Sequence, residues 1–93
     1  MKIENQKAVE KFVKDHARAH SSFEIWLDKT KAATWKTPTD VIATFPKSDC
    51  VDGLWIFNVG GNNYRLTALI GFNKQELKVV KVMTHAEYDK EKY

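Results

Sequence analysis

At 93 residues, 43% of them hydrophobic and 29% charged, the chain has the composition of a folded globular protein, which excludes a disordered one. This length suits one compact core, so we expect residues 1–93 to form a single domain. A formal net charge of +3 weakly favours polyanionic partners such as nucleic acid.

The expected compartment is a reducing cytoplasm. No stretch approaches the roughly 20 apolar residues of a membrane-spanning helix, so we expect no membrane association. The first five residues lack the basic and then apolar order of a secretory signal. Cys50 is the only cysteine in the sequence, so it has no partner for a disulfide within the chain.

The N-terminal residues predict a short strand followed by a helix. Residues 2–4 suit an edge strand, and Asn5 is the expected N-cap of the helix because its side chain can accept from first-turn amides. Apolar residues then recur at helical spacing, at Val9, Phe12, Val13 and Ala17.

Two further helices are expected before the middle of the chain. Residues 21–24, Ser-Ser-Phe-Glu, have the order of a capping box, and the helix that they begin should end near Ala33. Residues 37–40, Thr-Pro-Thr-Asp, supply a capping hydroxyl, a proline suited to the first helical position and an early acid. This third helix should run through Phe45 and end at Pro46.

The second half of the sequence predicts an antiparallel meander. Runs of β-branched and aromatic residues separated by turn residues indicate strands near 54–60, 63–72 and 76–84. Gly61-Asn62 is a tight-hairpin signal, because both central residues of such a turn need positive φ, and residues 73–75 make the second turn. The expected fold class is α+β, with the N-terminal helices packed on one face of the meander.

The hairpin also predicts which side chains share a face. If Gly60 pairs with Asn63, then Asn58 lies opposite Arg65, and alternation gives one apolar face that the helices cover. That core face comprises Trp55, Phe57, Val59, Leu66, Ala68, Ile70, Val80 and Val82. The opposite, exposed face comprises Asn58, Arg65, Thr67, Lys81 and Met83. The other register would push Lys81 into the core, where an unpaired ammonium is costly.

The residues that suggest chemistry are cationic, imidazole and phenol groups. The sequence has no Gly-rich phosphate loop, CxxC pair or HExxH, so we expect no metal and no cofactor. Arg65 and Lys81 share the polar face, while His85 and Tyr88 follow the last strand three residues apart, on one side of a helical turn. Such a set suits RNA cleavage, in which a 2′-hydroxyl attacks its own phosphate with a base, an acid and cations assisting.

Structural readings of the same residues stay open at this point. An arginine that begins a strand is commonly a surface residue, and His85 could simply cap Asp89 or a backbone carbonyl. Convergence on one predicted face makes the functional reading about as strong as the structural one.

Three spaced motifs resemble successive signatures of the HigB-type toxins of the RelE superfamily. They are Trp35-Lys36-Thr37-Pro38, then Phe57-Asn58-Val59-Gly60-Gly61-Asn62-Asn63-Tyr64-Arg65-Leu66, then Val82-Met83-Thr84-His85-Ala86-Glu87-Tyr88-Asp89. Three motifs in the right order across nearly the whole chain are more specific than any one of them. The resemblance implies a small RelE-like domain and a toxin of a type II toxin–antitoxin system, acting as a ribosome-dependent, metal-independent mRNA endonuclease.

The resemblance also implies residue roles. Arg65, His85 and Tyr88 are the expected catalytic residues, and either His85 or Tyr88 could be the base. The expected RNA-binding residues are Asn58, Asn62, Lys81 and Lys36. Asn63 and Tyr64 are expected to serve the hairpin and its packing.

The implied partners are mRNA, the ribosome and a cognate helix-turn-helix antitoxin resembling HigA, with DNA contacted only through the antitoxin complex. Two alternatives remain. One is a non-catalytic RNA- or antitoxin-binding module that uses the same face, and the other is a toxin without toxicity that serves only as a corepressor.

Overall fold

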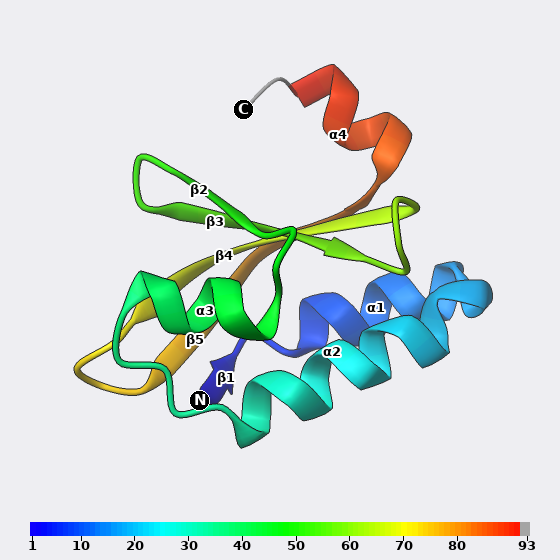
Figure 1. Cartoon of the computed structure of the whole chain (residues 1–93). Helices are drawn as coiled ribbons and strands as arrows, with labels where there is room; N and C mark the ends of the chain where they lie inside the picture. Colours follow the sequence, from blue (N-terminus) through cyan, green and yellow to red (C-terminus); the bar gives the residue numbers. More distant parts are fainter. Residues whose placement is uncertain (92–93) are drawn as a thin grey trace.

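Figure 1 shows the computed structural model, which describes residues 1–91. In chain order the elements are β1 (Lys2–Glu4), α1 (Lys7–Asp15), the 3₁₀ helix η1 (Ala17–Ala19), α2 (His20–Ala32), α3 (Pro38–Thr44), β2 (Asp49–Val51), β3 (Leu54–Val59), β4 (Tyr64–Gly71), β5 (Glu76–Thr84) and α4 (His85–Glu91). Among these residues, no helix combines the length and apolar character needed to cross a membrane.

The strands form one five-stranded sheet in the order β1-β5-β4-β3-β2. Strands β2 to β5 are an antiparallel meander, while β1 pairs in parallel with β5 and makes the sheet mixed. Helices α1, α2 and α3 lie on one face and α4 on the other (Figure 1). The expected α+β class, with the N-terminal helices on one face, is confirmed.

Aromatic rings join the helices to the sheet. In α2, Phe23, Trp26 and Thr30 are buried at positions i, i+3 and i+7, which is the spacing of one helix face. The Trp26 ring meets Phe57 of β3 edge to face, with centroids 5.4 Å apart. Tyr64 packs on Phe23 of α2 and Phe12 of α1, as expected of a packing residue.

Two of the expected helix caps are wrong. Asn5 has a φ of 62° and its side-chain amide donates to the Val79 carbonyl oxygen at 2.9 Å, so it ends β1 and does not cap α1. Helix α2 begins at His20, before the expected capping serines, because η1 leads directly into it. The carbonyl oxygen of Ala17 accepts from the His20 N–H, which leaves no capping role for Ser21.

The cap of α3 is confirmed. Thr37 and Asp40 form a capping box, and Pro38 occupies the first helical position. The Asp40 carboxylate accepts from the backbone N–H of Lys36 at 2.9 Å and from that of Thr37 at 3.2 Å. These two hydrogen bonds lower the pKa of Asp40 below its ordinary value of 3.8.

The β3–β4 register is confirmed, whereas the expected turn geometry is wrong. Asn58 lies opposite Arg65, as predicted. The residues with positive φ are Gly60 and Gly61, not Asn62, and the Asn63 N–H donates to the Gly60 carbonyl at 3.3 Å. A Cβ at Gly60 would lie 3.0 Å from the Ser22 hydroxyl oxygen, so this glycine allows the hairpin to approach α2.

The sequence reading also missed β2. It pairs with β3 through a two-residue turn, Asp52-Gly53, in which both residues have positive φ. Asp-Gly is itself a strong hairpin signal, so this strand was detectable from the sequence.

A β-bulge in β5 overturns one predicted core position. Thr67 pairs with Lys81 but Ala68 pairs with Val79, so Val80 is an extra residue in β5. Val80 is 46% exposed, and its neighbour Val79 is fully buried. Strict alternation along β5 from Val82 and Val80 would have turned Lys78 towards the helices. The bulge turns Val79 and Leu77 towards the helices instead.

Because of the bulge, the same substitution should have very different effects on stability at Val79 and at Val80. Val79→Ala should lower the free energy of unfolding by roughly 2 kcal/mol, because it removes two buried methyl groups and leaves a cavity. Val80→Ala should change it by less than about 0.5 kcal/mol. Urea unfolding followed by tryptophan fluorescence measures both, and equal losses would contradict the bulged register.

Candidate functional site

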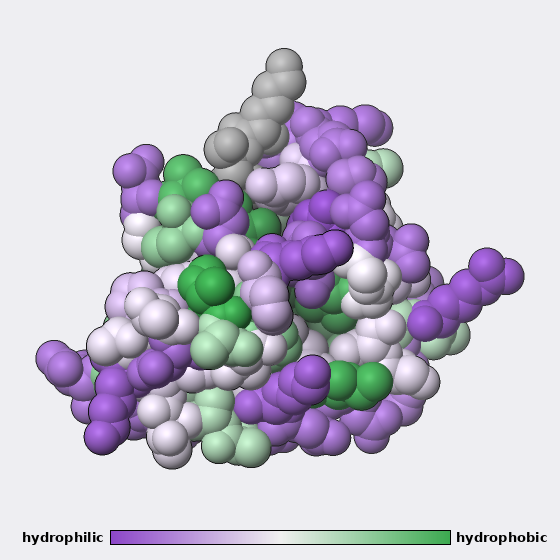
Figure 2. Space-filling model, in the orientation of Figure 1, coloured by the Kyte–Doolittle hydropathy of each residue, from purple (hydrophilic) through white to green (hydrophobic). Residues whose placement is uncertain are grey.

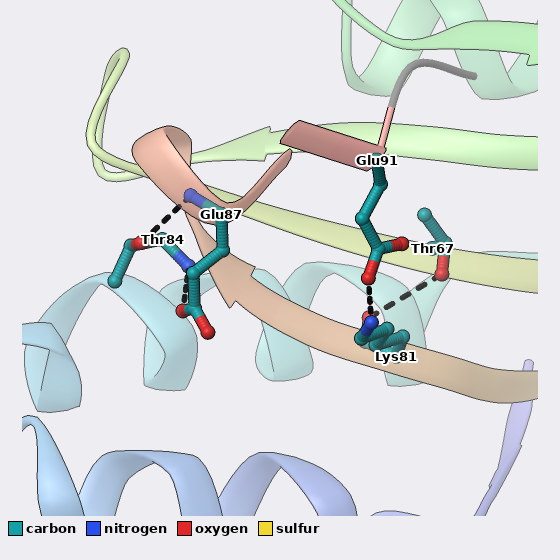
Figure 3. A network of polar contacts seen from close by, with 5 residues as sticks. All are labelled: Thr67, Lys81, Thr84, Glu87 and Glu91. Carbon is teal, nitrogen blue, oxygen red and sulfur yellow. Dashed lines mark hydrogen bonds and ion pairs between the residues drawn. The ribbon is translucent and has the colours of Figure 1, made fainter. Parts of the chain in front are cut away.

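The candidate site lies at the end of the sheet where the β3–β4 hairpin meets α4. The His85 backbone N–H donates to the Asn63 carbonyl at 2.9 Å, which ties the start of α4 to the hairpin. Thr84 and Glu87 form a reciprocal capping box (Figure 3). The Thr84 N–H donates to the Glu87 carboxylate at 2.9 Å, and the Glu87 N–H donates to the Thr84 hydroxyl at 3.2 Å. These contacts fix where α4 leaves the sheet.

Arg65 is at the centre of this site and is only 6% exposed. One terminal nitrogen, Nη2, donates to the Asn62 side-chain oxygen at 2.7 Å, and Nη1 donates to the Tyr64 carbonyl at 3.0 Å. The guanidinium carbon lies 5.4 Å from the centre of the Tyr88 ring. Within residues 1–91, the groups that hold this cation are neutral, so its positive charge remains available to an anion.

His85 and Tyr88 both come from α4, as their spacing predicted. The His85 side chain is 41% exposed, and its Nε2 lies 3.4 Å from the Asp89 carboxylate, one helical turn later. Its Nδ1 is buried without a hydrogen-bond partner in the described part of the chain. Nε2 is therefore the ring nitrogen that can exchange a proton with a bound molecule.

Lys81 links β5 to the far end of α4. By register it faces Thr67 across the β4–β5 ladder, and its ammonium forms an ion pair with Glu91 (Figure 3). The Thr67 hydroxyl donates to the Lys81 carbonyl at 3.4 Å. Lys81 thus helps to hold α4 over the sheet, a contact that the sequence did not reveal.

The sheet face that carries these groups was expected to be exposed, but three of its five residues are buried, while Lys81 is exposed and Asn58 is half-buried. Arg65 is 6% exposed, and Thr67 and Met83 are fully buried. The chain turns back after β5, so that α4 packs on β4 and β5 on the side away from α1, α2 and α3 (Figure 1). The sequence pattern predicted which side chains share this face, but it did not predict that α4 covers them.

The structure brings six of the seven predicted site residues to one end of the sheet. Arg65, Asn62, Lys81, His85 and Tyr88 meet around α4, and Asn58 is the cross-strand neighbour of Arg65. Lys36 is at the other end, because Trp35 beside it accepts a hydrogen bond from Gln75 in the β4–β5 turn. Lys36 therefore lies apart from the other six residues, and its role in RNA binding stays a prediction.

From the sequence, Asp89 was considered only as a structural partner of His85, and Glu91 was missed altogether. Asp89 lies beside His85 and Glu91 pairs with Lys81. The spacing of four between His85 and Asp89 was the signal, because residues four apart face each other on a helix. Within residues 1–91, no three His, Cys, Asp or Glu side chains come together as metal ligands would.

The arrangement offers one buried cation, one titratable imidazole and one phenol on adjacent elements. A guanidinium held by neutral groups can bind a phosphate oxygen, and an imidazole nitrogen can accept or donate a proton. Such a site can hold a phosphodiester and move a proton beside it.

Comparisons with known proteins point in the same direction. The family described as "HigB toxin, RelE-like toxic component of a toxin-antitoxin system" matches residues 19–91. The chain is 41% identical over 58 residues to the "mRNA interferase toxin HigB" of Escherichia coli strain K12, a match that covers 59% of this chain and 56% of that protein. It is 30% identical over 88 residues to the "mRNA interferase HigB" of Escherichia coli O6:H1, covering 91% of this chain and 82% of the relative. The first of these matches thus spans little more than half of the relative's length.

The capping box of α4 should make the stability of the fold depend on pH in the acidic range. Hydrogen bonding from the Thr84 N–H lowers the pKa of Glu87 below its ordinary value of 4.5, so its carboxylate stabilises the fold above that pH. This contribution should be lost as the pH falls through the lowered pKa of the folded state. Glu87→Ala should therefore be less stable than the natural chain at pH 7, and the difference should shrink towards pH 3.

Thermal unfolding at a series of pH values measures this difference. The control is Glu87→Gln, which keeps an acceptor oxygen but cannot titrate. A gap between Glu87→Ala and the natural chain that is the same at pH 3 and pH 7 would contradict the role of the carboxylate.

Proposed function

Because the chain belongs to the HigB toxin family, the RelE-like toxic components of toxin–antitoxin systems, we propose that it is a metal-independent RNA endonuclease that cleaves mRNA. The observation that carries this proposal is the Arg65 guanidinium, buried among neutral groups next to the Tyr88 ring of α4, with His85 three residues earlier on the same helix. The printed names of the relatives, "mRNA interferase", support the substrate class.

The proposed reaction is transfer of the phosphodiester to the neighbouring 2′-oxygen. The 2′-hydroxyl gives its proton to a base while its oxygen bonds to phosphorus, and the bond to the 5′-oxygen breaks. An acid protonates that leaving oxygen, so the products are a 2′,3′-cyclic phosphate and a 5′-hydroxyl end. Arg65 stabilises the non-bridging oxygens, and His85 Nε2 transfers a proton, with Tyr88 sharing or positioning that step. Which of the two is the base stays open in this proposal.

The proposed partners follow from the family. We expect the chain to act in the cytoplasm on mRNA at the ribosome and to be neutralised by a cognate helix-turn-helix antitoxin resembling HigA. In this proposal DNA is contacted only through the antitoxin complex. The solvent-facing Asn62 and the cation Lys81 assist RNA binding at the edge of the site.

A non-catalytic RNA- or antitoxin-binding module is the alternative. The observation that favours it is the 6% exposure of Arg65, since a catalytic guanidinium must reach the phosphate. Mapping transcript 5′ ends after induction of the protein separates the two functions, because binding alone creates no new ends.

The test of the proposed enzyme is His85→Gln, expected to lower mRNA cleavage in a ribosome-containing translation reaction by roughly 100- to 10,000-fold, because it removes the proton-transfer group. Arg65→Lys should lower cleavage about a hundredfold, since one ammonium replaces two oriented donors. Primer extension on a defined message gives both rates.

The matched control is His20→Gln. His20 is also on a helix and also lies beside a carboxylate four residues later, Glu24 at 3.7 Å, but it lines a hollow between α1 and α2. This variant should cleave at the natural rate. Melting temperatures of all variants show that they are folded. Cleavage by folded His85→Gln and Arg65→Lys at the rate of His20→Gln would rule out the assignment.

A further inference from the structure

A groove outside the site just described runs between α2, the α3–β2 loop and the β3–β4 hairpin. It consists of two adjoining hollows of about 230 Å³ and 180 Å³. Both hollows are lined by Lys29, Phe45 and Asn58, so they form one continuous depression. Hydrophilic and hydrophobic side chains are mixed on the face of the molecule seen in Figure 2.

The charge of this groove is uniformly positive. Lys29 of α2 and Lys47 of the α3–β2 loop both line the larger hollow. Among the described residues that line the two hollows there is no aspartate or glutamate. Within residues 1–91, neither lysine has a carboxylate within ion-pair distance. Two unneutralised ammonium groups on one groove favour a polyanion.

Two glycines contribute bare backbone to the part of the groove wall that the hairpin forms. Gly60 lines the smaller hollow and Gly61 the larger one. A Cβ at Gly61 would have nothing within 4 Å, so no side chain of the fold occupies that space. A bound chain can therefore approach the hairpin closely.

Phe45 adds an aromatic surface to the groove. Its ring is half-buried, lines both hollows and stacks on Trp26 with centroids 6.1 Å apart. Cations that follow a backbone, combined with an aromatic ring on which a base can stack, are the usual elements of single-strand binding. An acidic peptide would use the lysines but would not need the ring.

Asn58 connects the groove to the candidate site. It lines both hollows and is the cross-strand partner of Arg65, on strands that lie roughly 4.8 Å apart. A strand bound in the groove would therefore pass Asn58 on the way to Arg65.

From these observations we propose that the groove of Lys29, Phe45, Lys47 and Asn58 binds single-stranded RNA next to the scissile phosphate, with the lysines on phosphates and a base against Phe45. This inference rests on the proposed function, because it assigns the path of the RNA that the Arg65 site would cut. It adds a binding site beside α2 and the α3–β2 loop, on the other side of Asn58 from Arg65.

The experiment compares two double variants with the same net charge. Lys29→Gln/Lys47→Gln alters the groove, and Lys31→Gln/Lys74→Gln removes two exposed lysines outside it, one of them on the same helix. The probe is a fluorescein-labelled 2′-O-methyl RNA of twelve nucleotides, which cannot be cleaved. Binding to each full-length protein is measured by anisotropy from low to moderate salt.

The groove variant should bind the probe about tenfold more weakly than the control variant. Its plot of log affinity against log salt should be shallower by about 1.4, since each lost phosphate contact removes roughly 0.7 for single strands. Equal affinity and equal slope for the two variants, both folded by circular dichroism, would overturn the proposal.

Message cleavage in a ribosome-containing reaction keeps the two proposals apart. If the natural chain cuts no message, the proposed function fails, whatever the probe shows about the groove. If the natural chain cuts and both double variants cut and bind equally well, the groove proposal alone fails. If the groove variant binds RNA normally but loses an antitoxin, the groove is a peptide site and the proposal is overturned.

Discussion

One extra residue in β5 decides what the two faces of the sheet can hold. Val80 bulges out of the ladder opposite the Thr67–Ala68 step, so the strand changes phase in its middle. On one side of the bulge Leu77 and Val79 point into the aromatic core, and on the other Lys81 and Met83 point towards α4. Without this phase change Lys78 would face the core, and burying its ammonium would be costly. The same strand can thus complete the core and carry part of the site.

The end of β1 is coupled to this bulge. Pairing of β1 with β5 reaches Glu4 and Lys78, and the Asn5 side chain then donates to the carbonyl of Val79. Beyond that point α1 takes the place of β1 beside β5. The left-handed backbone of Asn5 makes the change of direction, and its amide satisfies the next carbonyl of the ladder. This explains why the residue expected to cap α1 serves the sheet instead.

Some local signals were predictable from the sequence, whereas the features that depend on distant contacts were not. The capping box of α3 and the register of Asn58 against Arg65 follow from residues close in the chain, so both were confirmed. The exposure of Val80 depends on a bulge that only the packed sheet requires, and the burial of Arg65 depends on α4 folding back. Lys36 was assigned to the site because it belongs to one of the three motifs. In the structure it lies at the opposite end of the sheet from Arg65, because Trp35 beside it contacts the β4–β5 turn.

The carboxylates of α4 determine which cations of the site an anion can bind without displacing a negative charge. Asp89 lies beside His85 and Glu91 pairs with Lys81, so a phosphate must compete with a carboxylate for either group. Arg65 differs, because its partners within residues 1–91 are an amide, a carbonyl and an aromatic ring. An anion that contacts Arg65 replaces no negative charge, so its attraction is not offset by the loss of an ion pair. Lys29 and Lys47 share this property within the described chain, and Asn58 joins them to Arg65. Arg65 on one side of Asn58, and Lys29 and Lys47 on the other, are thus cations without a carboxylate partner in the described chain, whereas Lys81 is paired with a carboxylate of α4.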